Sequence, residues 1–242
     1  MGKTLLILRL EGPMQSWGLR SRWDVRDSGD EPSKSGIVGL LGAALGYPRR
    51  DLRLESLDAA LRLGVRVERP GTRMVDFQTV SGVLVTANGS VKGAYDDPTT
   101  IISPREYLQD AAFLAAMDGP ADVLRACADA LQRPKWPIFL GRKGCPPTKP
   151  VFEELTGRYL DLADAMRRHP WGWEGMSTLV DPSSLPRTLQ CYLEDADGKA
   201  LRPDRIQTNA ARMYSRRAVH IYPVPFPGVS SPQDMVDAKE ET

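Results

Sequence analysis

The stretch that decides the fold runs from Leu10 to Gly46 and reads LEGPMQSWGLRSRWDVRDSGDEPSKSGIVGLLGAALG. It begins with the end of a strand, passes through a turn marked by glycine and tryptophan and a basic loop, and ends in a helix. The helix is predicted because apolar residues recur at helical spacing, namely Ile37, Val38, Leu40, Leu41, Ala44 and Leu45. Ser33 or Ser35 can cap its start, and Gly46 with Pro48 ends it.

The start of this helix has the chemistry of an anion site. Ser33, Lys34 and Ser35 bring hydrogen-bond donors and a positive charge to a point where free backbone amides already favour an anion. A phosphate group suits this site, and an ordinary capped helix lying on a sheet accounts for the same residues equally well. The glycines within the helix weaken it in isolation, so they indicate close packing against a flat surface.

The composition narrows the class of protein. Of the 242 residues, 41% are apolar and 26% charged, as in a globular protein with a sizeable core. The formal net charge is only +1, so a nucleic-acid surface has to come from local clusters of cations. The 3 cysteines form no CxxC pair, no apolar run reaches membrane-spanning length, and the N-terminus shows no signal peptide. We therefore expect a cytoplasmic protein with no membrane contact, metal or cofactor.

The order of predicted elements is that of an α+β fold. An apolar strand at Thr4–Leu10 precedes the helix, which is followed by an alternating strand at 64–69 and a partner strand at Met74–Val80. Strand, helix, strand, strand is the first part of a ferredoxin-like (RRM-like) unit. Ala121–Gln132 then shows the apolar face of a second helix. We assign residues 1–150 to this ferredoxin-like domain.

A basic loop after the first strand is a candidate for contact with nucleic acid. It places Trp17 and Trp23 among the polar and cationic residues Gln15, Arg20, Arg22 and Arg26. Aromatic rings interleaved with arginines offer stacking planes, and charge for the phosphates of a single strand. The alternative is that Trp17 packs beneath the glycine turn and that the arginines are solvated.

A second basic loop spans Pro134–Pro150. Gly141 and Gly144 free backbone amides there, as in a phosphate cradle, although the spacing is not that of a Walker A loop. The cations beside them are Arg142, Lys143 and Lys149. The alternative is a rigid linker stiffened by prolines.

The region from 151 to 242 has weaker patterns, and we expect a smaller β-rich region with a loose tail. Phe152–Met166 is predicted as helical, and strands are predicted at Arg187–Asp195 and Ala218–Val224. A loose series of cations comprises Arg202, Arg205, Arg212, Arg216 and Arg217. This series fits a phosphate track and a solvated face equally well.

Catalytic motifs are missing from the sequence. The chain has 2 histidines, His169 and His220, and shows no HExxH or GxSxG motif. RNA can nevertheless be cleaved without a metal through its own 2′-hydroxyl, with only a base, an acid and a cation. Metal-independent cleavage of RNA therefore stays open as an alternative.

Short motifs in both loops and in the helix resemble one known family. They are GPMQSWG at Gly12–Gly18, SGIVGLLGA at Ser35–Ala43 and LGRKGCPP at Leu140–Pro147. In this order and spacing they look like the CasD family, the subunit of the type I-E CRISPR surveillance complex (Cascade) that holds the 5′ handle of the guide RNA. The resemblance covers nearly all of residues 1–150 and only weakly the rest. It also implies that Arg105–Ala111 is a strand returning to the sheet.

The resemblance implies a role, partners and contacts. The chain would be a non-catalytic subunit of an antiviral ribonucleoprotein, with guide RNA, a CasC-type backbone subunit and a CasA-type large subunit as partners and target DNA as an indirect one. Residues 81–103 would form a protruding hairpin, the thumb, with Val83, Val85, Lys92 and Ile101 in its outer part, and the alternative is an insertion without fixed structure. The RNA contacts would be Gln15, Trp17, Arg20, Arg22, Arg26, Ser33, Lys34, Ser35, Arg105, Arg142, Lys143 and Lys149. In the related type I-C lineage a CasD-like protein cuts the repeat RNA, which is the source of the endoribonuclease alternative.

Overall fold

The computed structural model describes residues 2–19, 26–85, 89–172, 185–207 and 213–228. Its helices are α1 (Lys34–Leu45), α2 (Arg53–Ala60), α3 (Ala121–Gln132) and α4 (Leu162–Arg168). Its strands are β1 (Leu5–Glu11), β2 (Met14–Gln15), β3 (Arg62–Arg69), β4 (Thr72–Gly82), β5 (Leu84–Val85), β6 (Val91–Lys92), β7 (Thr99–Gln109), β8 (Ala112–Asp118), β9 (Phe152–Thr156), β10 (Thr188–Glu194), β11 (Ala200–Gln207) and β12 (Met213–Pro225). No helix among these residues is long and apolar enough to cross a membrane.

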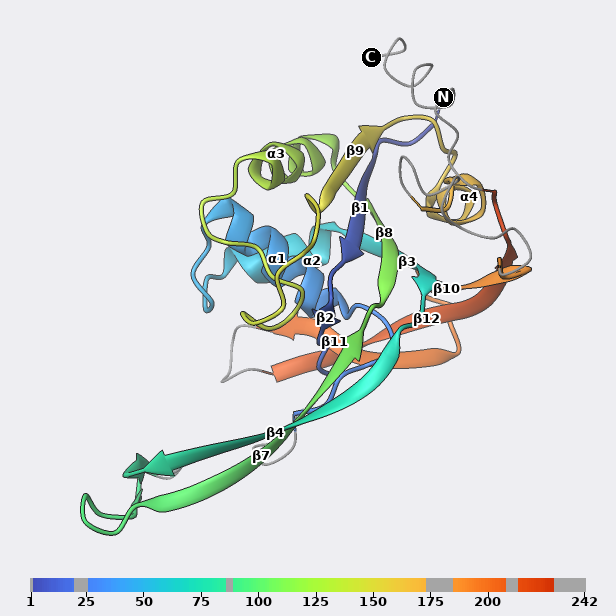
Figure 1. The fold of residues 1–242 in the computed structure, drawn as a ribbon. Coiled ribbons are helices and arrows are strands. Elements are labelled where there is room, and N and C mark those ends of the chain that lie inside the picture. The colour runs from blue at the N-terminus through green and yellow to red at the C-terminus, as the bar shows by residue number, and fades with distance from the viewer. Residues whose placement is uncertain (1, 20–25, 86–88, 173–184, 208–212, 229–242) are drawn as a thin grey trace.

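One antiparallel sheet forms the body, with its 7 strands in the order β11-β12-β10-β3-β8-β1-β9. Helices α1, α2 and α3 cover one face and α4 covers the other (Figure 1). Leu6 and Leu8 of β1 point into the core under α1 to α3, whereas Leu5 and Ile7 point into the core under α4. Because both faces are covered there, residues Leu5–Leu8 of β1 are all apolar rather than alternating, and the first charged residue of the strand is Arg9. The predicted α+β class is confirmed.

The predicted first and second helices are confirmed, and the two ends of α1 follow capping rules. Ser33, rather than Ser35, caps α1, since its Oγ accepts a hydrogen bond from the Gly36 amide at 3.3 Å. Gly46 ends α1 with a φ of 76°, in the left-handed region that favours glycine. The second helix, α3, spans the predicted residues Ala121–Gln132.

The segment predicted as a sheet strand, Met74–Val80, lies instead in a long hairpin that leaves the body. β4 pairs with β7 along its whole length, from Thr72 opposite Gln109 to Gly82 opposite Thr99, and the third strand of the body is β8. The hairpin therefore begins well before residue 81 and ends well after residue 103, as Figure 1 shows. Alternation along β4 suits a ribbon with one partly shielded face, which periodicity cannot distinguish from a half-buried sheet strand.

The predicted helix at Phe152–Met166 is wrong in its first part. Residues on both sides of the predicted domain boundary at 150 also contribute strands to the main sheet. Residues 152–156 form β9, which pairs with β1 opposite Leu5–Leu8, and only 162–168 are helical. β10 then pairs with β3, with Cys191 opposite Arg66. The C-terminal strands thus extend the sheet built by the N-terminal part, because β3 and β1 would otherwise leave unpaired edges.

Candidate nucleic-acid interface

Gln15 lies inside the protein at the root of the hairpin, not on a surface that RNA can reach. Its Nε2 donates to the carbonyl oxygens of Leu10 at 3.2 Å and Ala111 at 2.8 Å, and its Oε1 accepts from Trp17 Nε1 at 3.0 Å. These bonds tie the end of β1 to the junction between the hairpin and β8. The expected RNA contact of Gln15 is therefore replaced by a structural role.

Trp17 is buried, as in the alternative in which it packs beneath the glycine turn. Its side chain is 1% exposed, and a Cβ added to Gly36 would lie 2.8 Å from Trp17 Cε3. The ring therefore lies directly against the first turn of α1, where only glycine leaves room for it. This contact accounts for one of the helix glycines that predicted close packing.

Arg142 stabilises the hairpin root through its own hydrogen bonds. Its Nη1 donates to the carbonyl of Glu106 at 3.1 Å, and its Nη2 donates to the carbonyl of Arg26 at 2.8 Å. Its guanidinium lies 4.7 Å from the centroid of the Tyr107 ring, a cation–π contact. Arg142 thus binds β7 to the segment around residue 26, so its donors point at the protein.

The backbone of the second basic loop is also turned inward. The Gly141 amide donates to the Phe139 carbonyl at 3.1 Å, so it is not free to hold a phosphate. Gly141 has a φ of 85°, and an added Cβ would lie 1.8 Å from the Ser16 carbonyl oxygen. The loop therefore packs tightly on the segment after β2, while its cations Lys143 and Lys149 are exposed.

The anion predicted at the start of α1 is supplied by the protein itself. The Asp204 carboxylate accepts from the Lys34 backbone amide at 2.8 Å. The Lys34 side chain is fully buried, with Nζ 2.9 Å from Glu194 Oε1 and 3.8 Å from Asp58 Oδ2. Lys34 is thus inaccessible to RNA in this structure. The prediction of an anion at this helix end was chemically sound, but the anion comes from β11.

The other predicted contacts differ in exposure. Arg26, Ser35 and Arg105 are half-buried, Ser33 is buried at its cap position, and Arg20 and Arg22 lie outside the described residues, as does Trp23. Arg26 and Arg105 are neighbours, because an isolated parallel bridge joins them. Since Arg142 binds the Arg26 carbonyl, the structure brings these two arginines close to the loop that carries Lys143.

A pocket at the hairpin root was not predicted from the sequence. The pocket has a volume of about 330 Å³ and is lined by Leu19, Asp27, Ser28, Gly29, Asp30, Glu31, Arg73, Glu106 and Arg202. Arg73 of β4 donates to the Ser28 carbonyl at 2.8 Å and to Glu106 Oε2 at 2.5 Å, and pairs with Asp30. At the edge of an unstacked base, the carboxylates can accept hydrogen bonds and the guanidinium groups can donate them. The acidic run 27–31 was visible in the sequence, but its arginine partners lie on distant strands.

Burial affects the charge within this pocket. It raises the pKa of Glu31, although the hydrogen bond from Arg202 Nε at 2.5 Å opposes the rise. Arg202 thereby joins β11 to the loop at residue 31. The first and last parts of the chain therefore meet beside the hairpin root.

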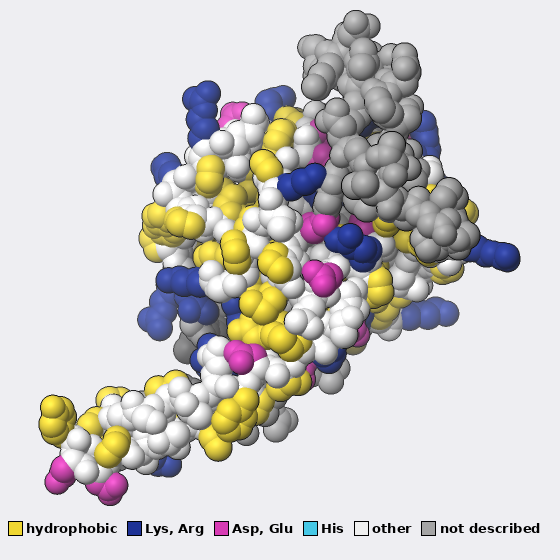
Figure 2. All heavy atoms as spheres, viewed as in Figure 1, with side chains coloured by type: hydrophobic (Ala, Val, Ile, Leu, Met, Phe, Trp, Pro, Cys, Tyr) yellow, Lys and Arg dark blue, Asp and Glu magenta, His cyan; other side chains and the backbone are white. Residues whose placement is uncertain are grey.

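The hairpin exposes apolar side chains over most of its length. Phe77 is 66% exposed, Val85 65% and Tyr95 100%. Val83 and Lys92 are also exposed, and Ile101 is half-buried. The 11 residues of β4 extend about 37 Å, and Figure 2 shows hydrophobic side chains along the projecting ribbon and at its tip.

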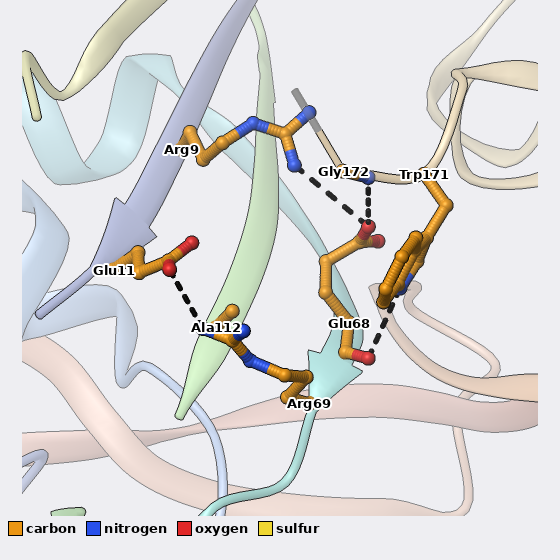
Figure 3. Close-up of a pocket in the computed structure, with 7 residues that line it drawn as sticks. All are labelled: Arg9, Glu11, Glu68, Arg69, Ala112, Trp171 and Gly172. Atoms are coloured by element: carbon orange, nitrogen blue, oxygen red, sulfur yellow. Dashed lines mark hydrogen bonds and ion pairs between the residues drawn. The ribbon is translucent and has the colours of Figure 1, made fainter. Parts of the chain in front are cut away.

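A second, smaller hollow lies on the body between β1, β3 and the segment after α4 (Figure 3). Arg9 Nη1 lies 3.8 Å from Glu68 Oε2, and Arg69 pairs with Glu11 at 2.6 Å. Trp171 Nε1 donates to the Glu68 carbonyl at 3.1 Å. These contacts fasten the segment at Trp171 to the sheet, so we assign the hollow a structural role.

Both histidines lie beside a tyrosine. His169 is buried, with Nδ1 3.0 Å from the Tyr159 hydroxyl and Nε2 3.1 Å from Glu153 Oε1. His220 is exposed on β12, and its ring centroid lies 5.3 Å from that of Tyr222. Burial raises the pKa of Tyr159 and of Tyr222 to about 12. Neither tyrosine is therefore a ready general base at neutral pH.

Comparison with known proteins identifies the family. The family model described as CRISPR-associated protein (Cas_Cas5) matches residues 5–224. The chain belongs to this family. Within it, the chain is 36% identical over 160 residues to the CRISPR system Cascade subunit CasD of Escherichia coli (strain K12), an alignment that covers 62% of this chain and 70% of CasD.

Solved structures extend the family relationship to the whole fold. A chain of a CRISPR RNA-guided surveillance complex superposes with a TM-score of 0.71 and 31% identity, covering 96% of both chains. The crystal structure of a Cas protein superposes with a TM-score of 0.68 and 32% identity, covering 94% of this chain and 99% of that one. The family's fold therefore includes the C-terminal strands as well as residues 1–150.

Proposed function

We propose that this chain is a subunit of a Cascade-type RNA-guided surveillance complex, in which it caps the 5′ handle of the guide RNA without cutting it. The similarity to a surveillance-complex chain over 96% of this chain supports the assembly role. The observation that carries the proposal is the hairpin. A two-stranded ribbon with exposed Val75, Phe77 and Val85 is marginal in water, so it is built to be covered by a partner.

The arrangement of the body supports a ferredoxin-like interpretation. Along the chain, β1, α1, β3, β8, α3 and β9 follow the β-α-β-β-α-β order, with α2 as an addition. The hairpin is inserted in the chain between β3 and β8, which are neighbours in the sheet, so it extends from the ends of these two strands. We propose that this insertion is the thumb, which separates the handle from the rest of the guide.

The RNA would follow the exposed cations near the hairpin root. Arg26 and Arg105 lie together there, and Lys143 is exposed on the loop that Arg142 binds to them. Lys149 is exposed farther along the same loop. The pocket lined by Arg73 and its carboxylate neighbours would take an unstacked base of the handle. The apolar tip, with Lys92 as its cation, would contact a CasC-type subunit. The CasA-type subunit and the target DNA would be partners only within the assembled complex.

A salt titration tests the RNA site. The variant with Lys143→Gln and Lys149→Gln should bind guide RNA with a log–log salt slope reduced by about 1.4, since each phosphate contact to a single strand contributes about 0.7. Arg167→Gln with Arg168→Gln, which removes two exposed charges on α4, is the matched control and should leave the slope unchanged. The RNA should remain intact in chelator. An unchanged slope removes these lysines from the site, and a discrete cleavage product contradicts the non-cutting role.

A further inference from the structure

A basic surface lies at the C-terminal end of α1, away from the hairpin root. We define the α1-end patch by its exposed members Arg49, Arg50, Arg53, Arg133, Lys135 and Trp136. In Figure 2, Lys and Arg side chains gather at the edge of the body where Figure 1 places the loop between α1 and α2. The whole chain carries a formal net charge of only +1, so this concentration of cations is local.

Backbone hydrogen bonds bring the two halves of the patch together. The amides of Lys135 and Trp136 donate to the carbonyl oxygens of Ala44 at 2.9 Å and Ala43 at 3.3 Å. The Lys135 stem crosses the end of the helix, since a Cβ added to Gly46 would lie 2.5 Å from Lys135 Cδ. The segment after α3 is therefore fixed against the segment after α1, and the cations of both segments share one surface.

The aromatic groups of this surface are placed for contact with planar ligands. Trp136 is 44% exposed, although tryptophan is usually well covered in a folded protein. Close by, the Arg53 guanidinium lies 4.0 Å from the centroid of the Tyr47 ring and is held in place by a bond to Asp51 at 2.6 Å. The surface thus combines an exposed ring with an ordered cation at Arg53 and further exposed cations.

The patch is separate from the proposed handle site. Trp17, at the hairpin root, lies against Gly36 in the first turn of α1, whereas the patch lies beyond its last turn. The 12 residues of α1 correspond to about 18 Å. The patch and the hairpin root therefore lie at opposite ends of α1.

We propose that the α1-end patch binds single-stranded nucleic acid without sequence preference. The cations would contact consecutive phosphates and a base would stack on Trp136, the combination by which proteins hold single strands. A duplex would use the cations alone, because its bases are stacked inside. The exposed tryptophan therefore favours a single strand, and this inference does not depend on recognition of the handle.

The test measures binding of labelled oligothymidine to the full chain by fluorescence polarisation. Trp136→Ala should weaken binding about 5- to 140-fold, the equivalent of one base–aromatic stack, and Trp136→Phe should retain most of it. The triple variant Arg50→Gln, Arg133→Gln and Lys135→Gln should reduce the log–log salt slope by about 2. The matched control removes three exposed arginines elsewhere, by Arg167→Gln, Arg168→Gln and Arg187→Gln, and should change neither quantity.

Several outcomes would overturn the proposal. The wild-type chain failing to bind oligothymidine, or the control losing as much affinity as the triple variant, would show that the patch is not a site. Duplex DNA binding as tightly, with no effect of Trp136→Ala, would exclude the stacking role. The patch would be part of the handle site if saturating handle RNA displaced oligothymidine and the triple variant lowered the affinity for both ligands equally. Oligothymidine that stays bound beside handle RNA would support a second site.

Discussion

The buried position of Lys34 leads to a sharp prediction: Lys34→Met should destabilise the protein while leaving its RNA surface intact. Removing one partner of a buried ion pair costs about 3–5 kcal/mol, because the other charge stays buried. The carboxylates left behind still have ion-pair partners. Glu194 Oε2 lies 3.9 Å from Arg217 Nη1, and Asp58 Oδ2 lies 3.3 Å from Arg205 Nε. We therefore expect a loss near about 3 kcal/mol, the lower end of that range.

Thermal unfolding followed by circular dichroism measures this loss. For a chain of this length, about 3 kcal/mol corresponds to a fall in Tm of about 6–12 °C. The matched control is Lys143→Met, which removes an exposed lysine. It should leave Tm nearly unchanged, because surface substitutions usually stay within about 0.5 kcal/mol, but should weaken RNA binding. RNA affinity of both variants is measured well below their Tm.

A double variant shows whether the ion pair is the cause. Burial raises the pKa of Asp58 and the charge of Lys34 lowers it, so Asp58 loses its main support when Lys34 is removed. Adding Asp58→Asn to Lys34→Met should therefore cost less than the two single changes together. A Tm of Lys34→Met equal to that of the wild type would refute the structural role. A folded Lys34→Met that loses as much RNA affinity as Lys143→Met would restore the RNA contact predicted from the sequence.

Further predictions concern buried titratable groups. Burial raises the pKa of Cys127 to about 11 and that of Cys191 to about 12. A disulfide reagent at neutral pH should therefore label neither thiol until the protein is unfolded. Rapid labelling of the native protein would show that the thiols are accessible. Burial raises the pKa of Glu153, but hydrogen bonds with His169 and Arg9 and the Arg9 charge outweigh it and hold this pKa at about 2. Because the folded pKa lies below the ordinary value of about 4.3, Glu153 contributes stability above that value and loses it as the pH falls towards 2. Urea midpoints measured across this range should fall less steeply for Glu153→Gln, and parallel curves would contradict the assignment.

Local patterns in the sequence predicted α1 and α3 well, because helical periodicity and caps involve residues within a few positions of one another. The strand predicted at Met74–Val80 is present within β4, but its partner was predicted wrongly, since a strand in a projecting ribbon and a strand in a sheet share the same alternation. Prediction failed at 152–156, where a short polar strand owes its conformation to the unpaired edge of β1. In each case the deciding partner is far away along the chain.

The candidate site shows the same limit in chemical terms. The sequence correctly placed donors at the start of α1, yet it could not show that Asp204 fills that position from β11. It likewise marked Arg142 as a cation in a glycine-rich loop, whereas the fold commits its donors to backbone carbonyls of distant segments. Lys143 and Lys149 are exposed, so their contact with RNA stays a prediction.

By itself the sequence determined the α+β class, α1 with its caps, the extent of α3, and the motifs that carry the family resemblance. These features depend on residue type and short spacing, which local sterics and hydrogen bonding translate directly into structure. The tertiary structure alone decided which charges are buried and which are exposed, how far the hairpin projects, and that the C-terminal strands complete the main sheet. Those outcomes depend on contacts between segments far apart in the chain, because burial and ion pairing arise only once the sheet has assembled.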